Sequence, residues 1–283
     1  MSDEHGPGER ALVERAVAGN TAALEEVVAS LRDPLYRLAL RMVARPADAE
    51  DATQEILIRV ITRLSSWRGE ASLLTWAYRV GVNYLLNLRR QTPQESREIS
   101  FEKFRDRLAD GLAATDYAGP EAELLAHEVR LTCTQAMLQC LDRDERITYV
   151  LGEIFELPSA EAAWTLSITP AAYRKRLERA RQRLREFMNS TCGLVNPDAF
   201  CRCERRTAKA IALGRMAPGR APSLAAHPVS RPGRDVAEAA AQIGQLHDAA
   251  AVLRAHPDYA APRDRTDAVL TLLRSGRFPL LES

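Results

Sequence analysis

Residues 157–184 have the sequence LPSAEAAWTLSITPAAYRKRLERARQRL, which predicts two helices joined by a tight turn. Pro158 opens a short apolar-periodic segment, residues 167–169 form the turn, and Thr169 is placed to cap a second helix whose first residue is Pro170. The second helix has apolar residues at spacings of three and four on one face, and arginine fills most of its other positions. This part of the chain is therefore expected to be α-helical.

Positive charge is concentrated around the second of these helices. Residues 171–209 contain eleven Lys and Arg residues against four Asp and Glu residues, whereas the net charge of the whole 283-residue chain is +1. A short helix, a turn and a capped basic helix have the form of a helix-turn-helix that enters the major groove of DNA, where Tyr173, Arg174 and Arg176 would read base edges. A solvated basic surface helix is the alternative interpretation.

The first ninety residues are also predicted to be helical almost throughout, because apolar residues recur at steps of three and four. Pro34 and Pro46 are expected at helix starts, where a missing amide hydrogen costs little. Residues 91–120 lose this period in a polar run and a glycine-containing run, which predicts a linker. The expected fold class is therefore all-α, with two helical domains on a flexible linker.

Two further stretches carry side chains suited to binding. Residues 65–90 interleave aromatic side chains with Arg and Asn, a mixture that stacks unpaired bases at about 1–3 kcal/mol per base while it holds their phosphates. Packing of the same aromatic residues into the core is the alternative. Residues 47–64 place acidic and amide side chains beside an apolar face, which by itself indicates a solvated amphipathic helix, with protein docking as the less common alternative.

The order of these features resembles the extracytoplasmic-function (ECF) sigma factors, a group of the sigma-70 family in bacterial RNA polymerase. DAEDATQE is followed by a Trp-Arg-Gly loop, by LTWAYRVGVNYLLNLRR, by a linker and by the helix-turn-helix, so the resemblance covers roughly residues 12–188. It implies a chain that binds core RNA polymerase and directs promoter-specific initiation through the minus-ten and minus-thirty-five elements, with no active site of its own. A free-standing helix-turn-helix regulator of duplex DNA is the alternative function.

The resemblance also implies roles for individual residues. The polymerase-docking helix contains Asp48, Glu50, Asp51, Gln54 and Glu55. Recognition and melting of the minus-ten element is assigned to Trp67, Arg68, Trp76, Arg79, Asn83, Arg89 and Arg90. Recognition of the minus-thirty-five element is assigned to Thr169, Tyr173, Arg174, Arg176 and Arg179. The implied partners are core RNA polymerase and promoter DNA, and an anti-sigma factor is a further candidate partner.

The implied domain layout extends beyond a short sigma factor. Its parts are sigma region 2 at 1–90, the linker at 91–120, the helix-turn-helix region 4 at 121–188, a cysteine-containing segment at 189–216, a second linker at 217–234 and a helical extension at 235–283. The extension is expected to pack on one of the sigma domains and to modulate access to polymerase or promoter. A passive helical appendage is the alternative.

The cysteine-containing segment departs from the plan of short ECF sigma factors. In TCGLVNPDAFCRCERR, residues 191–206, three cysteines fall within twelve residues: Cys192, Cys201 and Cys203. Three thiolates bind zinc when a fourth ligand completes the site, and His127, His227 or another partner would supply it. A redox-active thiol set and merely structural thiols are the two alternatives. Cys133 and Cys140 are expected to be buried small apolar residues.

Several functions are not expected from this sequence. No apolar run approaches the roughly 18 residues of a membrane span, and the N-terminus MSDEHGPGER lacks a signal-peptide pattern, so a cytoplasmic protein without a membrane partner is expected. The sequence has no GxGxxG after a strand, no phosphate-binding Gly-Lys-Ser/Thr loop and no HExxH motif, so the chain is not expected to be an enzyme. Zinc at the C-terminal cysteines is the one candidate cofactor that the sequence indicates.

Overall fold

The computed structural model of the protein describes residues 7–88, 99–219, 249–254, 256, 258–262 and 269–271. These residues are predominantly α-helical, so the predicted all-α fold class is confirmed. No helix within the described ranges combines the length and the apolarity that crossing a membrane requires.

The first domain is a helical bundle. Its elements, in chain order, are α1 (Pro7–Val17), α2 (Thr21–Val43), α3 (Pro46–Thr62), the short 3-10 helix η1 (Leu64–Ser66) and α4 (Leu73–Asn87). Helices α2, α3 and α4 pack on one another, and α1 packs on α2. Leu35, Ile56 and Ala77, one from each of these three packed helices, are fully buried in the shared core. The apolar periodicity of the sequence thus corresponds to one core.

Helix α2 continues through Pro34, so the prediction that Pro34 starts a helix is wrong. An interior proline lacks an amide hydrogen and costs a helix about 3 kcal/mol. The flanking residues Leu31 and Leu35 are buried in the bundle core, and their burial offsets this cost. Pro46, by contrast, lies in the first turn of α3, as predicted.

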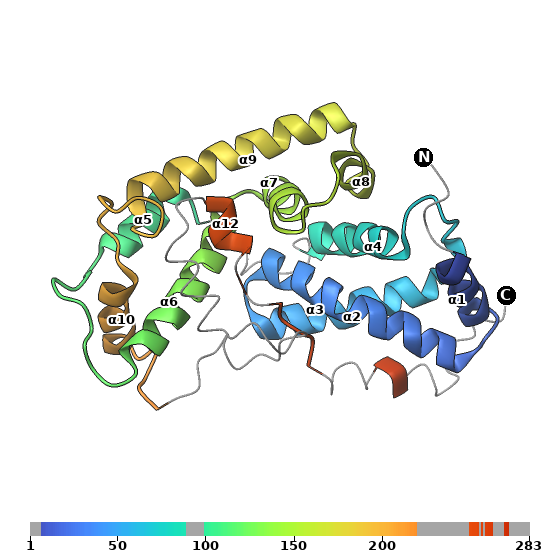
Figure 1. Cartoon of the computed structure of the whole chain (residues 1–283), viewed down its shortest axis with the longest axis horizontal. Helices are drawn as coiled ribbons and strands as arrows, with labels where there is room; N and C mark the ends of the chain where they lie inside the picture. Colours follow the sequence, from blue (N-terminus) through green and yellow to red (C-terminus); the bar gives the residue numbers. More distant parts are fainter. Residues whose placement is uncertain are drawn as a thin grey trace.

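The second domain contains the predicted helix-turn-helix. Its elements are α5 (Phe101–Ala109), α6 (Ala122–Met137), the 3-10 helix η4 (Leu138–Cys140), α7 (Arg143–Tyr149), the π-helical turn η5 (Val150–Ile154), α8 (Ser159–Thr165), α9 (Pro170–Thr191) and α10 (Cys203–Ala212). Figure 1 shows α9 along the upper edge of the molecule, above α7 and α8. Helix α9 packs on both of these helices.

The turn between α8 and α9 has the predicted cap. The hydroxyl of Thr169 accepts a hydrogen bond from the amide of Ala172 at 3.2 Å, and Pro170 lies in the first turn of α9. Ser167, in the turn itself, has a positive φ of 55°. The apolar face of α9 is buried, which leaves the arginine-rich positions on its outer faces.

The segment predicted as a linker, residues 91–120, contains helix α5. The hydroxyl of Ser100 caps this helix by accepting a hydrogen bond from the amide of Lys103 at 3.2 Å. The rings of Phe101 and Phe104 pack against Phe187 of α9, with centroids 5.0 and 5.8 Å apart respectively. Two phenylalanines in a polar run give too short a pattern for a periodic signal, so the sequence did not predict this helix.

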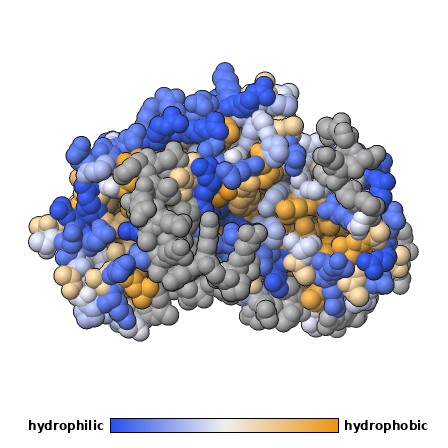
Figure 2. Space-filling view, in the orientation of Figure 1, coloured by the Kyte–Doolittle hydropathy of each residue, from blue (hydrophilic) through white to orange (hydrophobic). Residues whose placement is uncertain are grey.

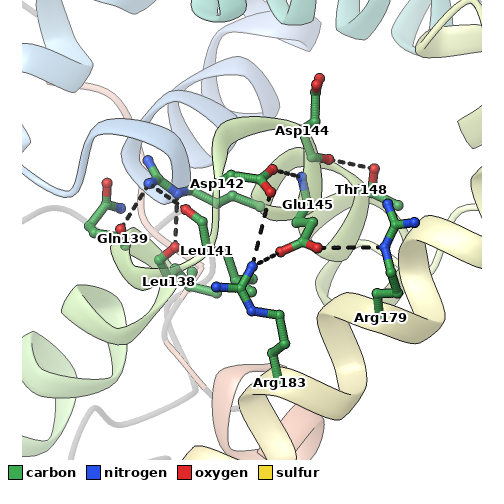
Figure 3. A network of polar contacts seen from close by, with 10 residues as sticks. Leu138, Gln139, Leu141, Asp142, Asp144, Glu145, Thr148, Arg179 and Arg183 are labelled. Carbon is green, nitrogen blue, oxygen red and sulfur yellow. Dashed lines mark hydrogen bonds and ion pairs between the residues drawn. The ribbon is translucent and has the colours of Figure 1, made fainter. Parts of the chain in front are cut away.

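A seam of buried polar contacts joins the two domains. The guanidinium of Arg146, a residue only 5% exposed, donates to the carbonyl oxygens of Met42 at the end of α2 and Leu138 in η4, at 2.7 and 2.8 Å. It also donates to the carbonyl oxygens of Gln139 and Leu141, at 3.1 and 3.0 Å. Figure 3 shows Leu138, Gln139 and Leu141 converging at this point. One side chain therefore satisfies carbonyl groups at the ends of helices from both domains.

Arg41 of α2 extends this seam. Its guanidinium donates to the side-chain oxygen of Gln135 on α6 at 2.9 Å, and the Gln135 amide donates to the carbonyl oxygen of Leu40 at 2.6 Å. Arg41 also donates to the carbonyl oxygen of Leu253 at 3.2 Å, in helix α12 (Ala249–Arg254). The seam thus connects both domains and the terminal part of the chain.

The described terminal residues contact both domains, whereas the sequence analysis expected the extension to pack on one. Helix α12 packs against η5, α6 and α9. The ring of His256 is hydrogen-bonded to the hydroxyl of Thr134 on α6 at 2.6 Å, and the amide of Ala261 donates to the carboxylate of Asp33 on α2 at 3.2 Å. Most of the second predicted linker and much of the predicted terminal helical pair lie outside the described residues.

The variant Arg146→Ala should lower the free energy of unfolding by about 3 kcal/mol, because it leaves buried carbonyl groups without a donor. Urea denaturation followed by circular dichroism measures the change. The control Arg105→Ala removes an exposed arginine, and it should alter stability by about 0.5 kcal/mol or less. Equal shifts in the two variants would contradict a central role for Arg146.

Docking of the terminal segment should weaken as the pH falls. Burial, with a smaller contribution from the charge of Arg41, holds the pKa of His256 well below its usual value of 6.5. The docked ring is therefore neutral, whereas an undocked ring takes up a proton below about pH 6.5. The docking free energy is fully present above that pH and is lost as the pH drops.

Hydrogen exchange of residues 249–254, corrected for intrinsic rates, should therefore be faster at about pH 5.5 than at about pH 7. The variant His256→Gln, which cannot titrate, should lose most of this difference. The same pH dependence in both proteins would show that another group is responsible.

Candidate nucleic-acid and polymerase interfaces

The predicted docking residues lie on the exposed face of α3, opposite the core. Asp51 is exposed, and the partly exposed members of the set are Asp48, Glu50, Gln54 and Glu55. Glu55 forms an ion pair with Arg59 one turn later at 2.9 Å, and both side chains are 41% exposed. An exposed pair of this kind contributes about 0.3–0.5 kcal/mol, so a protein partner can displace it. The structure therefore leaves this acidic face accessible.

Trp67 organises the loop between η1 and α4. Its side chain is buried, and its indole Nε1 donates to the carbonyl oxygen of Ala71 at 3.1 Å. The next residue, Arg68, is exposed, and Gly69 has a φ of 75°, a conformation that favours glycine. In this arrangement the loop presents Arg68 to solvent, while Trp67 packs inward.

One face of α4 lies against the second domain. The guanidinium of Arg79 lies over the ring of Trp164 in α8, 4.5 Å from the ring centroid. The hydroxyl of Thr75 donates to the carboxylate of Glu161 in α8 at 3.1 Å. Helix α8 therefore covers part of the surface that the sequence assigned to the minus-ten element.

The other residues assigned to the minus-ten element differ in their surroundings. Trp76 is partly buried and packs against the core, whereas Asn83 is exposed. Arg89 and Arg90 lie outside the described residues.

The outer face of α9 is a basic surface. Thr169, Arg174 and Lys175 are exposed around its first turns, and Figure 2 shows hydrophilic residues along the edge that α9 forms. Tyr173, in contrast, is only 1% exposed. Its hydroxyl oxygen lies so close to Gly152 that a Cβ atom added to that glycine would be 2.4 Å from the oxygen. Burial raises the pKa of Tyr173 to about 12. In this arrangement Tyr173 supports the helix from inside the core.

The other arginines assigned to DNA reading contact α7. Arg176 pairs with Asp144 at 3.5 Å, and Arg179 pairs with Glu145 at 3.7 Å. Figure 3 shows that Arg183 also binds Glu145, a residue only 6% exposed. A buried carboxylate that receives two guanidinium groups fixes the orientation of α9 on α7. The sequence did not indicate these pairs, because the acidic partners lie on another helix.

Four cysteines gather where α6 meets the segment between α9 and α10. Cys192 is the C-cap of α9 and forms an isolated parallel β-bridge with Cys201, and Cys203 is the first residue of α10. Burial, and to a smaller extent the nearby thiols of Cys201, Cys192 and Cys203, raises the pKa of Cys133 on α6 well above its usual range. From the sequence, Cys133 was expected to be a buried small apolar residue outside this group. Cys140 is buried elsewhere, at the end of η4.

Of the two histidines expected as a fourth ligand, the structure describes His127. His127 is buried with its imidazole 4.0 Å from Glu123, and His227 lies outside the described residues. Burial raises the pKa of Cys201 to about 11 and that of Cys203 to about 12. In the part of the chain that the structure describes, no group of three or more His, Cys, Asp or Glu side chains is positioned to hold a metal ion.

Among solved structures, that of CnrH in complex with the cytosolic domain of CnrY resembles this chain. The TM-score is 0.45 and the sequence identity is 23%, over 64% of this chain and 97% of that one.

Two sequence families match the chain in the order of its domains. Sigma-70 region 2 matches residues 27–93, and sigma-70 region 4 matches residues 131–184. The ECF RNA polymerase sigma factor SigE of Mycolicibacterium smegmatis is 32% identical over 174 residues, which are 60% of this chain and 64% of that protein. The ECF RNA polymerase sigma-E factor of Escherichia coli K12 is 29% identical over 62% of this chain and 91% of its own length.

These matches end where region 4 ends, and the cysteine-containing segment follows. The chain therefore belongs to the sigma-70 family, in its ECF group, as a non-enzymatic sigma factor in which regions 2 and 4 are followed by an extension.

Proposed function

We propose that this sigma factor docks on core RNA polymerase through α3, meets the minus-ten element through α4 and the loop before it, and reads the minus-thirty-five element through α9. The observation that carries the proposal is the α8-turn-α9 unit, because its basic helix is capped by Thr169 and exposed along its outer face. RNA synthesis itself remains the work of the polymerase.

The start of α9 offers contacts for both backbone and bases. Arg174 and Lys175 are exposed near the N-terminal end of the helix, where the helix dipole also favours phosphate. Arg176 and Arg179 would exchange Asp144 and Glu145 for DNA phosphates. Because one anion replaces another, the arginines keep charge-assisted hydrogen bonds throughout this exchange.

The packed domains would have to separate on a promoter. The names of the two elements place their centres about 25 base pairs apart, which corresponds to about 85 Å at 3.4 Å per base pair. Helices α4 and α8, in contrast, are in direct contact through Arg79 and Trp164. The chain between α4 and α6 has about 34 residues, nine of them in α5, and reaches about 95 Å with α5 kept helical and the rest extended. It is long enough for this separation if α5 leaves its site on Phe187 of α9.

An anti-sigma partner and a cytoplasmic location belong to the same proposal. The acidic face of α3 and the basic face of α9 are exposed in the described structure. A protein that covers the first would block polymerase, and one that covers the second would block DNA. The polymerase acts in the cytoplasm, so the proposed role places the chain there.

Reversing the charge of the α3 face should abolish docking on polymerase. The variant Asp51→Arg with Glu55→Arg should weaken association by at least about tenfold, because like charges then face each other across the interface. Co-elution of the full chain with core RNA polymerase on size exclusion measures this.

The matched control is Glu14→Arg with Glu26→Arg, which reverses two exposed carboxylates on α1 and α2. This control should co-elute like the wild type. Loss of binding in both variants, or in neither, would contradict the assignment of α3. A wild-type chain that runs free of polymerase but binds specific duplex DNA alone would favour the free-standing regulator.

Weakening the contact between α4 and α8 should favour the open form. The variant Trp164→Ala with Glu161→Ala removes a cation–π contact of about 0.5–1 kcal/mol and a hydrogen bond of about 1 kcal/mol. A larger fraction of the chain is then open, so the apparent affinity for core RNA polymerase should rise by up to about thirtyfold.

Titration of fluorescently labelled chain with core polymerase measures this affinity. The control Ala160→Ser alters an exposed residue of α8 and should bind like the wild type. Unchanged or weaker binding of the double variant would show that these contacts do not oppose docking.

A further inference from the structure

The segment between α9 and α10 brings four thiols to one end of the molecule. Figure 1 shows α6 and α10 side by side at that end, and the two helices pack on each other. Cys133 comes from α6, while Cys192, Cys201 and Cys203 come from the end of α9, the following loop and the start of α10. The last three lie beyond the sigma-70 region 4 match, in the extension of this chain, whereas Cys133 lies within that match.

The backbone holds Cys192 and Cys201 next to each other. The amide of Gly193 donates to the carbonyl oxygen of Cys201 at 3.0 Å, and the amide of Cys201 donates to the carbonyl oxygen of Thr191 at 3.2 Å. A Cβ atom on Gly193 would lie 2.7 Å from the Cys201 carbonyl oxygen, so this close approach requires glycine.

The thiol of Cys192 lies within a turn that is built to receive hydrogen bonds. Burial raises the pKa of the Cys192 thiol, and the backbone amides of Leu194 and Val195 partly offset this rise. Amide hydrogen bonds to sulfur stabilise a thiolate, the form of cysteine that binds metals. A purely apolar role for Cys192 would not require this turn.

Contacts between α6 and α10 place Cys133 beside the other thiols. Arg130, one turn before Cys133 on α6, pairs with Glu204 of α10 at 3.8 Å. Glu204 directly follows Cys203, so the face of α6 that carries Cys133 looks toward the start of α10. The electrostatic interactions of Cys133 with the other three thiols agree with this placement.

The segment has little apolar material with which to hold itself in place. In residues 193–216, the buried apolar side chains besides cysteine are Val195 and Ala199, and Phe200 and Leu213 are exposed at 37% and 49%. Short segments with so small a core are usually held by a disulfide or a structural metal.

Basic side chains surround the thiols. Burial raises the pKa of the Cys203 thiol and that of the Cys201 thiol; the charge of Arg130 partly offsets the rise at Cys203, and the charges of Arg206 and Arg202 partly offset the rise at Cys201. Four thiolates around one divalent cation carry a net double negative charge, which nearby guanidinium groups stabilise.

We propose that Cys133, Cys192, Cys201 and Cys203 are the ligands of a structural zinc ion that fastens the extension to α6. Zinc is the fitting ion because structural zinc sites are tetrahedral and accept four cysteine ligands. The thiols as described do not stand at ligand positions. Binding therefore requires the thiols to deprotonate and to close around the ion, as coupled metal sites do.

The test begins with the metal content of the purified full chain. Inductively coupled plasma mass spectrometry should find about one zinc ion per chain. Cobalt added to the metal-free chain should give the thiolate-to-metal absorption bands of a tetrahedral sulfur site. These measurements do not depend on transcription, so they stand apart from the proposed function.

Serine variants then identify the ligands. Cys133→Ser and Cys201→Ser should each lower zinc affinity by at least about tenfold. The matched control is Cys140→Ser, which removes a buried thiol outside the group and should retain zinc. Circular dichroism checks that each variant is folded. If a variant is unfolded, the cobalt spectrum of the wild-type chain still shows whether a tetrahedral sulfur site exists.

Three results would overturn the proposal. The first is a wild-type chain that holds no zinc and gives no cobalt bands, including one whose thiols are paired as disulfides. The second is iron in place of zinc, which would indicate a cluster. The third is undiminished zinc binding by folded Cys133→Ser, which would remove Cys133 from the site.

Discussion

The buried guanidinium of Arg146 sets how the two domains of this sigma factor meet. The last turns of a helix leave carbonyl groups without partners, and a buried junction of helix ends must supply donors for them. Arg146 supplies donors to Met42 at the end of α2 and to Leu138, Gln139 and Leu141 beyond α6. Its charge also suits the negative ends of the helix dipoles. Helix α7, which carries Arg146, packs on both α2 and α4, so this junction lies beside the contact of α4 with α8.

The junction between the domains has polar contacts beside apolar ones, such as the stacked rings of Tyr78 and Phe155 with centroids 5.5 Å apart. The polar contacts suit the separation of the domains that the proposed function requires. Apolar surface costs roughly 25 cal/mol per Å² when it returns to water, whereas a hydrogen bond exchanged for one to water costs only about 0.5–1.5 kcal/mol net. Hydrogen bonds such as those of Arg41 with Gln135 and of Arg146 with Met42 therefore orient the two domains relative to each other. Each adds only moderately to the free energy needed to separate the domains. A polymerase that binds only the open form can then shift the population.

Local signals in the sequence predicted the parts of the fold that depend on local geometry. The Thr169 and Pro170 pair predicted where α9 begins, because capping involves residues adjacent in the chain. Pro34 was misassigned, since the burial of its neighbours in the bundle overrides the local cost. The pairing of Arg179 with α7 and the position of Cys133 could not be predicted, because both depend on how separate helices pack. The assignment of side chains to DNA remains a prediction.

The chemistry that α4 would use for DNA also explains why α8 can cover it. Arg79 lies on the ring of Trp164, and an unpaired base offers the same kind of flat face to a guanidinium. An exposed cation–π contact contributes about 0.5–1 kcal/mol, whereas stacking on a base contributes about 1–3 kcal/mol. Melted DNA can therefore displace α8 once the domains part, but duplex DNA keeps its bases stacked inside and offers no such face. Under the proposed function, the closed contact would thus favour melted promoter DNA over duplex DNA as the partner of α4.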